Sequence, residues 1–378
     1  MISSIGSYLL EYENGHSYYT FVPEQLTNLR LGPFDEETGS LLINAHRQLG
    51  ILEGRIRTIY NLNQYGSLLS RYEAVLSCQM TGIDISLTDL WDIYTKNTKG
   101  ISSVESYLST MKYGFNHIHK IKTPSKLFCQ IYRVLTGCQE KSDIALLRKT
   151  QIFTEPRVSV IGLPMYNPPN PENVKNAYSD YEKYWNIICK HDILIQAALI
   201  YFQFCTIQPF IDDNDRVTRI LTSLFFIKRE ILSQPLLCLS YYFCKDRVGY
   251  NEQLNYSRGR YNNSYESWIK YFIKSVIIAA EKTNAVLTSF ERIKTEDSTR
   301  ISAEENLPKQ AIVVYEGLWD NPIIETRQVA KNMSISYNTA AKIVNALTKL
   351  GILEQIGDQN RYRRYVYKNL FDVFADNL

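Results

Sequence analysis

The stretch QPFIDDNDRVTR, residues 208–219, separates two apolar segments and sets the fold around them. The segments 192–207 and 220–231 both space large aliphatic and aromatic residues as buried helices do. The stretch between them is crowded with charged and amide side chains: Asp212, Asp213, Asn214, Asp215, Arg216 and Arg219. Packing alone does not explain these residues, because ionised groups avoid protein interiors unless they are paired. We therefore predict a polar loop that opens onto a helix, where free N–H groups and the helix dipole favour a phosphate.

This loop resembles the signature HxFx[DE]GNGRxxR of Fic-domain proteins. As a family, these proteins transfer AMP or related phosphate-containing groups from a nucleotide onto hydroxyl side chains. The matching positions are Pro209, Phe210, Asp212, Asn214, Arg216 and Arg219. Three positions depart from the signature, since Gln208 replaces the catalytic His and Asp213 and Asp215 replace glycines.

The resemblance implies a role for each matching residue, with Mg and ATP as cofactors if the site is competent. Asp212 would hold the divalent cation, as carboxylates do beside substrate phosphates. Asn214 would face the α-phosphate, and Arg216 and Arg219 would hold the outer phosphates. Gln208 cannot act as a general base because an amide is not usefully basic, and losing a base typically removes about 10²–10⁴ in rate.

The two aspartates leave two readings open. Asp213 and Asp215 add bulk and negative charge where glycines let the backbone approach a phosphate. The same carboxylates can accept the free N–H groups at the helix start and can pair with Arg216 or Arg219. The loop then satisfies its own anion site. We predict a Fic-type protein that resembles adenylyltransferases but is inactive or altered in chemistry, and nucleotide use remains the other reading.

The segment EAVLSCQMTGIDISLTDL, residues 73–90, resembles the inhibitory helix often joined to Fic domains. That helix carries a motif close to SSxIEG, whose Glu pairs with the second signature Arg. Ser77 stands at the serine pair and Gly82 at the glycine, whereas Thr81 stands at the Glu. Because a Thr cannot form an ion pair, we expect Arg219 to lack its usual partner from this helix.

The segment RVSVIGLPMYNPPNPE, residues 157–172, predicts a short hairpin followed by a stiff turn. It resembles the Fic flap, which docks a target protein by adding its segment as an extra strand. The flap residues implied by this resemblance are Val158, Val160, Ile161 and Gly162.

Composition places the chain among ordinary globular proteins. The 378 residues are 45% hydrophobic and 21% charged with a net charge of +3, which argues against disorder and against a strongly basic nucleic-acid binder. Seven cysteines without a CxxC pair read as buried thiols in a reducing compartment. With no secretion signal and no apolar run long enough to span a bilayer, we expect a cytoplasmic protein without membrane contact.

We predict a mainly α-helical chain with a small hairpin flap. Residues 1–110 would form a loosely structured arm, up to residue 33, and an N-terminal helical region with helices at 36–59, 67–79, 87–94 and 102–118. Residues 111–293 would form the Fic domain, with helices at 124–135, 171–188 and 264–292 beside the signature pair. The charged segment 294–307 lacks an apolar stripe and reads as a linker.

Residues 308–378 predict a winged helix-turn-helix domain, of a kind that Fic proteins with this architecture often carry. Three short helices at 309–319, 325–333 and 337–350 are followed by two strands around 357–360. Asn338 and Lys342 would face duplex DNA, and Arg361, Arg363 and Arg364 would hold phosphates. The alternative function is a DNA-binding transcriptional regulator that uses the Fic body as a scaffold or as the contact of a homodimer. A winged helix used only for dimerisation or protein contact is a further possibility.

Overall fold

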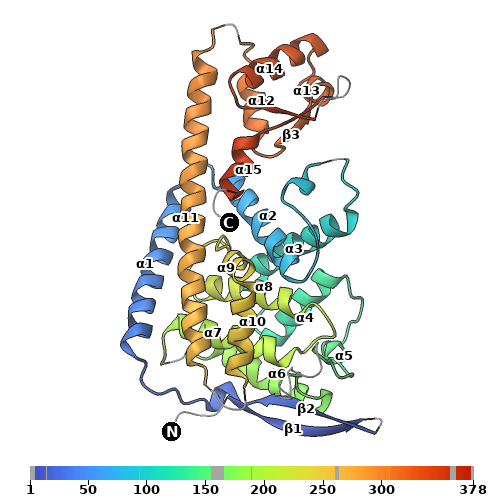
Figure 1. Ribbon diagram of the computed structural model, residues 1–378, viewed down its shortest axis with the longest axis vertical. Coiled ribbons are helices and arrows are strands. Elements are labelled where there is room, and N and C mark those ends of the chain that lie inside the picture. The colour runs from blue at the N-terminus through green and yellow to red at the C-terminus, as the bar shows by residue number, and fades with distance from the viewer. Residues whose placement is uncertain are drawn as a thin grey trace.

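The computed structural model describes residues 5–13, 15–92, 94–154, 166–188, 190–259, 264–305, 307–357 and 363–375. It is mainly α-helical with small antiparallel sheets, which confirms the predicted fold class. Figure 1 shows an elongated molecule with a helical body at one end and the C-terminal unit at the other, connected by one long helix. Among the described residues, no helix combines the length and the apolar character that crossing a bilayer requires.

The N-terminal segment is a regular hairpin, so the expectation of a loosely structured arm was wrong. Strands β1 (Gly6–Glu13) and β2 (His16–Pro23) pair antiparallel along their full length. Tyr and Phe favour strands when one side of the ribbon packs on a body. Here Phe21 is 1% exposed and packs edge-on against Tyr8 and Tyr166. Thr20 of β2 is buried beside Phe21, so this end of the hairpin is fixed to the body.

Most of the helices expected in the body are present. The described elements are α1 (Glu36–Thr58), α2 (Leu62–Met80), α3 (Thr98–His117), α4 (Pro124–Thr136), α5 (Asp143–Leu146), α6 (Pro171–Asn186), α7 (Ile193–Ile207), α8 (Asn214–Lys228), α9 (Ser240–Lys245), α10 (Arg247–Ser257) and α11 (Glu266–Ala303). Gly137 ends α4, with a φ of 71° that glycine adopts without cost. Helix α7 is almost entirely buried between α6, α8 and α11, so the signature stretch begins in the centre of the core.

The helix predicted at 87–94 is reduced to a 3₁₀ turn, Thr88–Leu90. Reciprocal hydrogen bonds typical of a helix start do form before it, because the Ser86 N–H donates to the Asp89 carboxylate and the Asp89 N–H donates to the Ser86 hydroxyl. The chain then leaves the helical path to reach the C-terminal unit. Trp91 Nε1 donates to the Asp320 carbonyl, and this tertiary contact takes the place of another helical turn.

The predicted linker 294–307 is helical as far as Ala303, because α11 continues through it. Asp297 lies in this segment, is 1% exposed, and accepts a 2.6 Å hydrogen bond from the Tyr367 hydroxyl. Ile301 is also buried. This segment is held in place partly by a buried carboxylate and not by a continuous apolar stripe. Its sequence therefore resembled a linker.

The C-terminal unit contains the three expected helices, α12 (Ala311–Gly317), α13 (Thr326–Asn332) and α14 (Tyr337–Lys349). Three short strands, β3 (Ile323–Glu325), β4 (Glu354–Ile356) and β5 (Arg364–Val366), form an antiparallel sheet in the order β3-β5-β4. The sequence had indicated two strands, and β3 is an addition. The winged-helix assignment stays a prediction, and Arg361 lies outside the described residues.

A last helix, α15 (Lys368–Ala375), returns from the C-terminal unit to the body. Phe374 of α15 packs against Tyr72 of α2 with ring centroids 4.6 Å apart, and against Phe290 of α11. Aromatic pairs of this kind contribute beyond the area they bury. Helix α2 therefore connects the C-terminal unit with the signature region.

Candidate functional site

The backbone of the signature loop is held in an uncommon conformation at two residues. Gln208 ends α7 with a φ of 43°, and Asp213 begins α8 with a φ of 53°. A left-handed conformation costs a residue with a side chain roughly 1–2 kcal/mol, so surrounding contacts must hold it. Gln208 and Asp213 occupy the positions of the family's His and first glycine.

Arg148 supplies contacts that hold this loop, and sequence reasoning missed it. This residue is 4% exposed, and its Nε donates to the Gln208 carbonyl at 2.8 Å. Its backbone N–H donates to the Pro209 carbonyl, and Nη2 also reaches the Pro169 carbonyl. Burial lowers the pKa of Arg148 to about 10. The residue follows α5 outside any motif, so no signal in the sequence identified it.

Asn214 closes the loop on itself instead of facing outward. Its side-chain oxygen accepts from the Phe210 N–H at 3.0 Å, and its side-chain nitrogen donates to the Phe210 carbonyl at 2.9 Å. The residue is 6% exposed. Both halves of the amide are therefore occupied by the loop backbone.

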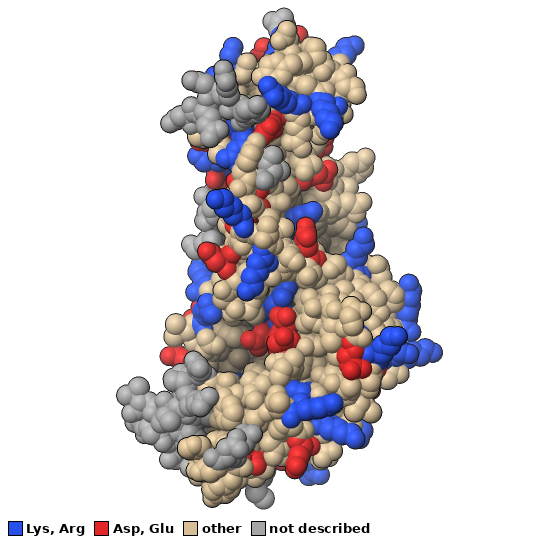
Figure 2. Space-filling view, turned by 90° about the vertical axis from the view of Figure 1, so that its right-hand side faces the viewer, with Lys and Arg blue, Asp and Glu red and all other residues tan. Residues whose placement is uncertain are grey.

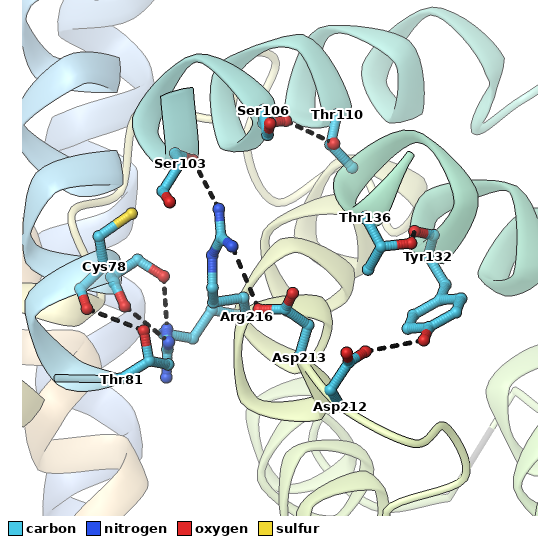
Figure 3. A network of polar contacts seen from close by, with 12 residues as sticks. Cys78, Thr81, Ser103, Ser106, Thr110, Tyr132, Thr136, Asp212, Asp213 and Arg216 are labelled. Carbon is cyan, nitrogen blue, oxygen red and sulfur yellow. Dashed lines mark hydrogen bonds and ion pairs between the residues drawn. The ribbon is translucent and has the colours of Figure 1, made fainter. Parts of the chain in front are cut away.

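Arg216 is buried and bonded within the protein. Its Nη1 forms an ion pair with Asp213 at 3.1 Å, and its Nη2 donates to the Ser103 carbonyl at 2.6 Å. Figure 3 shows the side chain extending from α8 towards α3, with Asp213 beside it. The pairing of Asp213 with Arg216 confirms one of the interactions that the sequence suggested.

Arg219 is more deeply buried, at 1% exposure. Its Nε donates to the Ser77 hydroxyl at 2.7 Å and its Nη2 to the Ser77 carbonyl at 2.9 Å. Thr81 occupies the position of the usual Glu and donates to the Cys78 carbonyl, so the helix supplies Arg219 with a different partner. The partner is Ser77 of α2, four residues before Thr81.

Thr81 and Gly82 end α2 and serve its C-terminus. The Thr81 hydroxyl donates to the Cys78 carbonyl, and Gly82 has a φ of 81°, as a residue that follows a helix often does. Figure 3 shows Thr81 next to Cys78 at this end of the helix. The segment we aligned with the inhibitory motif thus contacts the signature through Ser77.

The expectation that both aspartates cap α8 was wrong. Asp213 is the N-cap residue, but its side chain accepts no N–H from the first turn, because its carboxylate turns to Arg216. The Asp215 carboxylate accepts a 3.9 Å contact from the Cys205 thiol and forms no ion pair with either arginine among the described residues.

Asp212 is exposed, and the Tyr132 hydroxyl on α4 donates to its Oδ1 at 2.7 Å. Figure 3 shows the two side chains meeting between the loop and α4. Tyr132 also stacks on Phe210, with ring centroids 4.2 Å apart. A single carboxylate suits Mg²⁺ only when substrate phosphates complete the shell. No group of three or more metal-ligating side chains occurs among the described residues.

Behind the two arginines lies a buried carboxyl that the sequence did not single out. Glu73 of α2 is 5% exposed and accepts from the Ser240 N–H, the Ser240 hydroxyl and the Tyr107 hydroxyl. Burial raises the pKa of Glu73 to about 7, against the opposing effect of these donors and of the Arg219 charge. One face of α2 thus carries both Glu73 and the partner of Arg219.

Comparison with known proteins accounts for this architecture. The model of the Fic/DOC family matches residues 122–226, and that of its N-terminal region matches residues 40–116. The chain belongs to the Fic/DOC family. The flap residues Val158, Val160, Ile161 and Gly162 lie outside the described residues, so the flap assignment stays a prediction.

One solved structure of a Fic family protein shares the fold at low sequence identity, and two others align with lower scores. A Fic family protein from Desulfovibrio desulfuricans G20 aligns with a TM-score of 0.54 at 11% identity, over 89% of this chain and 97% of that chain. A Fic domain containing signaling protein from Bacteroides thetaiotaomicron gives 0.46 at 11% identity, over 64% and 95% of the two chains. Residues 134–508 of Fic-1 from C. elegans give 0.47 at 14% identity, over 67% and 73%.

The residues present do not fit the triphosphate of a Fic nucleotide site. Such a site needs guanidinium and amide donors that face the ligand, and here these donors are buried and bonded to the protein. Gln208 offers no base, and the described part of the loop provides no imidazole. No step through a nucleotide or a metal follows from this geometry.

The candidate DNA-binding residues fall into two groups. Asn338 and Lys342 of α14 and Arg363 are exposed. Arg364 forms a 2.6 Å ion pair with Asp92 and lies over the Tyr94 ring, so it belongs to the junction with the body. The structure therefore leaves α14 open and uses Arg364 for an internal contact.

Proposed function

We propose that this protein is a Fic-type protein without base-catalysed transferase activity, in which the signature loop has become a structural element. The family includes AMP-transferring enzymes, and the fold is inherited. The observation that carries the proposal is the state of the signature donors. Arg216, Arg219 and Asn214 are each 6% exposed or less and each is bonded within the protein.

The free energy needed to release the two arginines argues against binding of a triphosphate by the unmodified loop. A ligand would have to separate Arg216 from Asp213 and withdraw Arg219 from Ser77. Breaking buried interactions of charged groups costs about 3–5 kcal/mol in comparable cases. The ligand's triphosphate would also meet the negative charges of Asp213 and Asp215.

The test is calorimetric titration with ATP and magnesium of the unmodified chain and of the variant with Asp213→Gly and Asp215→Gly. We expect no heat of binding from the unmodified chain. The variant should gain measurable binding, because Asp213→Gly releases Arg216 from its acid and suits the left-handed conformation without strain. The single change Asp215→Gly is the control and should gain less, since Asp215 pairs with neither arginine.

Binding of ATP by the unmodified chain at micromolar concentrations would overturn the proposal. It would require that the arginines exchange their protein partners for phosphates in solution. Transfer of labelled nucleotide to a target protein would then become the next measurement.

A second candidate function is binding of duplex DNA by the C-terminal unit, as in a transcriptional regulator with the Fic body as its scaffold. The observation that favours it is the charge of residues 326–353, which contain Arg327, Lys331, Lys342 and Lys349 and no Asp or Glu. This segment includes α13 and α14, and the side chains of all four cations are exposed. On the face in Figure 2, basic side chains are visible on the upper, C-terminal unit together with some acidic ones, and side chains of both signs are spread over the body.

DNA binding is tested by titrating labelled duplexes of mixed sequence at several salt concentrations. We expect affinity to fall as salt rises, and the variant Lys342→Ala to weaken binding and reduce the salt slope by about 1. Arg292→Ala, on the exposed side of α11, is the matched control and should change neither. Unaltered binding in Lys342→Ala would place the contact elsewhere, and no binding to any duplex would favour a protein contact.

A further inference from the structure

A cavity of about 460 Å³ lies between α2 and α3 and is closed on one side by residues 234–236. It is separate from the signature loop. Leu62 of α2 and Leu108, Met111 and Phe115 of α3 supply apolar walls. Sites for small molecules are concave, mostly apolar and about 300–1,000 Å³ in volume, so this cavity has the size and the walls of a binding site.

Among the described residues, the charged side chains that line this cavity are all positive: Arg71 of α2 and Lys112 of α3. Lys112 is exposed, whereas Arg71 is partly buried. A cavity whose lining combines apolar walls with two cations suits a molecule with an apolar body and an anionic head.

Arg71 has few partners for a half-buried guanidinium. It donates to the Ser67 hydroxyl and carbonyl, and it lies over the Trp91 ring at 5.6 Å. Within the described residues, no carboxylate lies at ion-pair distance from it, and Asp320 acts on it only through longer-range charge. Burial lowers the pKa of Arg71, because the loss of hydration outweighs the stabilisation of the cation by the charge of Asp320. Removing a cation from water is costly unless an anion pairs with it.

We propose that this cavity binds a small amphipathic carboxylate, with its aliphatic body between α2 and α3 and its carboxylate on Arg71. Arginine presents a planar fork that matches a carboxylate, and Lys112 adds a second positive charge at the opening. Binding at this site does not depend on whether the signature loop binds a nucleotide, because the two sites share no residues.

Trp91 connects this cavity with the C-terminal unit. Its ring contacts the Arg71 guanidinium, packs edge-on against Phe371 of α15, and donates to the Asp320 carbonyl. A carboxylate on Arg71 changes the charge beside this ring. The other tryptophans, Trp185, Trp268 and Trp319, are at most 1% exposed and lie elsewhere in the core, so Trp91 is a natural reporter.

The test uses octanoate as the probe and acetate, octan-1-ol and octylamine as comparison compounds. Binding of each compound to the full chain is measured by calorimetry and by tryptophan fluorescence. We expect saturable binding of octanoate with a change in emission that is lost in Trp91→Phe. Acetate lacks the apolar body, octan-1-ol lacks the charge and octylamine carries the wrong charge, so each should bind at least tenfold more weakly.

Two variants examine the role of the cations. Arg71→Gln should lower the affinity for octanoate at least about tenfold, as expected when a hydrogen bond to a charged group is lost. Lys112 is exposed, so Lys112→Gln cannot disturb the core, and this variant should bind octanoate several-fold more weakly. Arg292→Gln, far along α11, should leave affinity unchanged. The proposal is overturned if octanoate does not bind, if octylamine binds equally well, or if both Arg71→Gln and Lys112→Gln retain the unmodified affinity.

Discussion

The signature loop and the α13–α14 segment both carry basic and amide side chains, yet these side chains are buried in the loop and exposed on α14. In the loop, Arg216 and Arg219 are buried and bonded to protein groups. In residues 326–353, Lys342 is exposed and the segment itself contains no Asp or Glu. The difference shows that a charged motif is a ligand site only where tertiary contacts leave its charges unpaired.

The cause lies in the neighbouring helices. Helix α8 begins between α2 and α3, so its arginines meet Ser77 on one side and the Ser103 carbonyl on the other. Helix α14 buries only one stripe, formed by Ala340, Ile343, Val344 and Leu347, and its other side faces solvent. Three measurements would break or sharpen this contrast.

The largest effect is expected from Arg219→Ala. This change leaves a cavity in the core and leaves the Ser77 carbonyl and hydroxyl without their donor. We expect the free energy of unfolding to fall by about 3 kcal/mol or more, measured by urea denaturation. Arg292→Ala on the surface of α11 is the control, with an expected change within about 0.5 kcal/mol. A loss below 1 kcal/mol for Arg219→Ala would mean that this arginine leaves Ser77 in solution.

The second effect is a pH dependence that originates at Glu73, next to these arginines. Burial raises its pKa from 4.5 to about 7, so the folded state binds a proton more tightly than the unfolded state. The contribution of Glu73 to the free energy of unfolding is therefore greatest below pH 4.5 and is lost as the pH rises to about 7. The rise from 4.5 to about 7 corresponds to roughly 3 kcal/mol.

Glu73→Gln removes this titration. The stability of the unmodified chain relative to the variant should fall between pH 4.5 and pH 8, as measured by urea denaturation at four pH values. The absolute difference also includes the altered hydrogen bonds to Ser240, so the slope is the informative quantity. A difference that stays constant over this range would show that Glu73 does not titrate there.

The smallest effect on stability is expected from Lys342→Ala. An exposed side chain on the open side of α14 contributes within about 0.5 kcal/mol to the free energy of unfolding. Thermal unfolding of this variant beside Arg219→Ala would measure the contrast directly. A large loss for Lys342→Ala would show that the α14 surface is covered in solution.

The sequence alone determined the fold of this protein to a large extent. Helical periodicity located the helices around the signature, and the signature together with the N-terminal region indicated the Fic/DOC family. Such features depend on local spacing and on residue identity, and both can be read along the chain. Replacement of the catalytic His by Gln208 was equally visible, because the chemistry of one side chain does not depend on its surroundings.

Only the tertiary structure decided which groups pair. Asp213 turns to Arg216 instead of capping α8, Arg219 finds Ser77 on a helix more than a hundred residues earlier, and Arg148 holds the loop from outside any motif. The charged end of α11 is a helix because Asp297 meets Tyr367 across the junction with the C-terminal unit. Pairing energies arise between segments that are distant in sequence, so a single sequence shows which charges exist but not which of them remain available to a ligand.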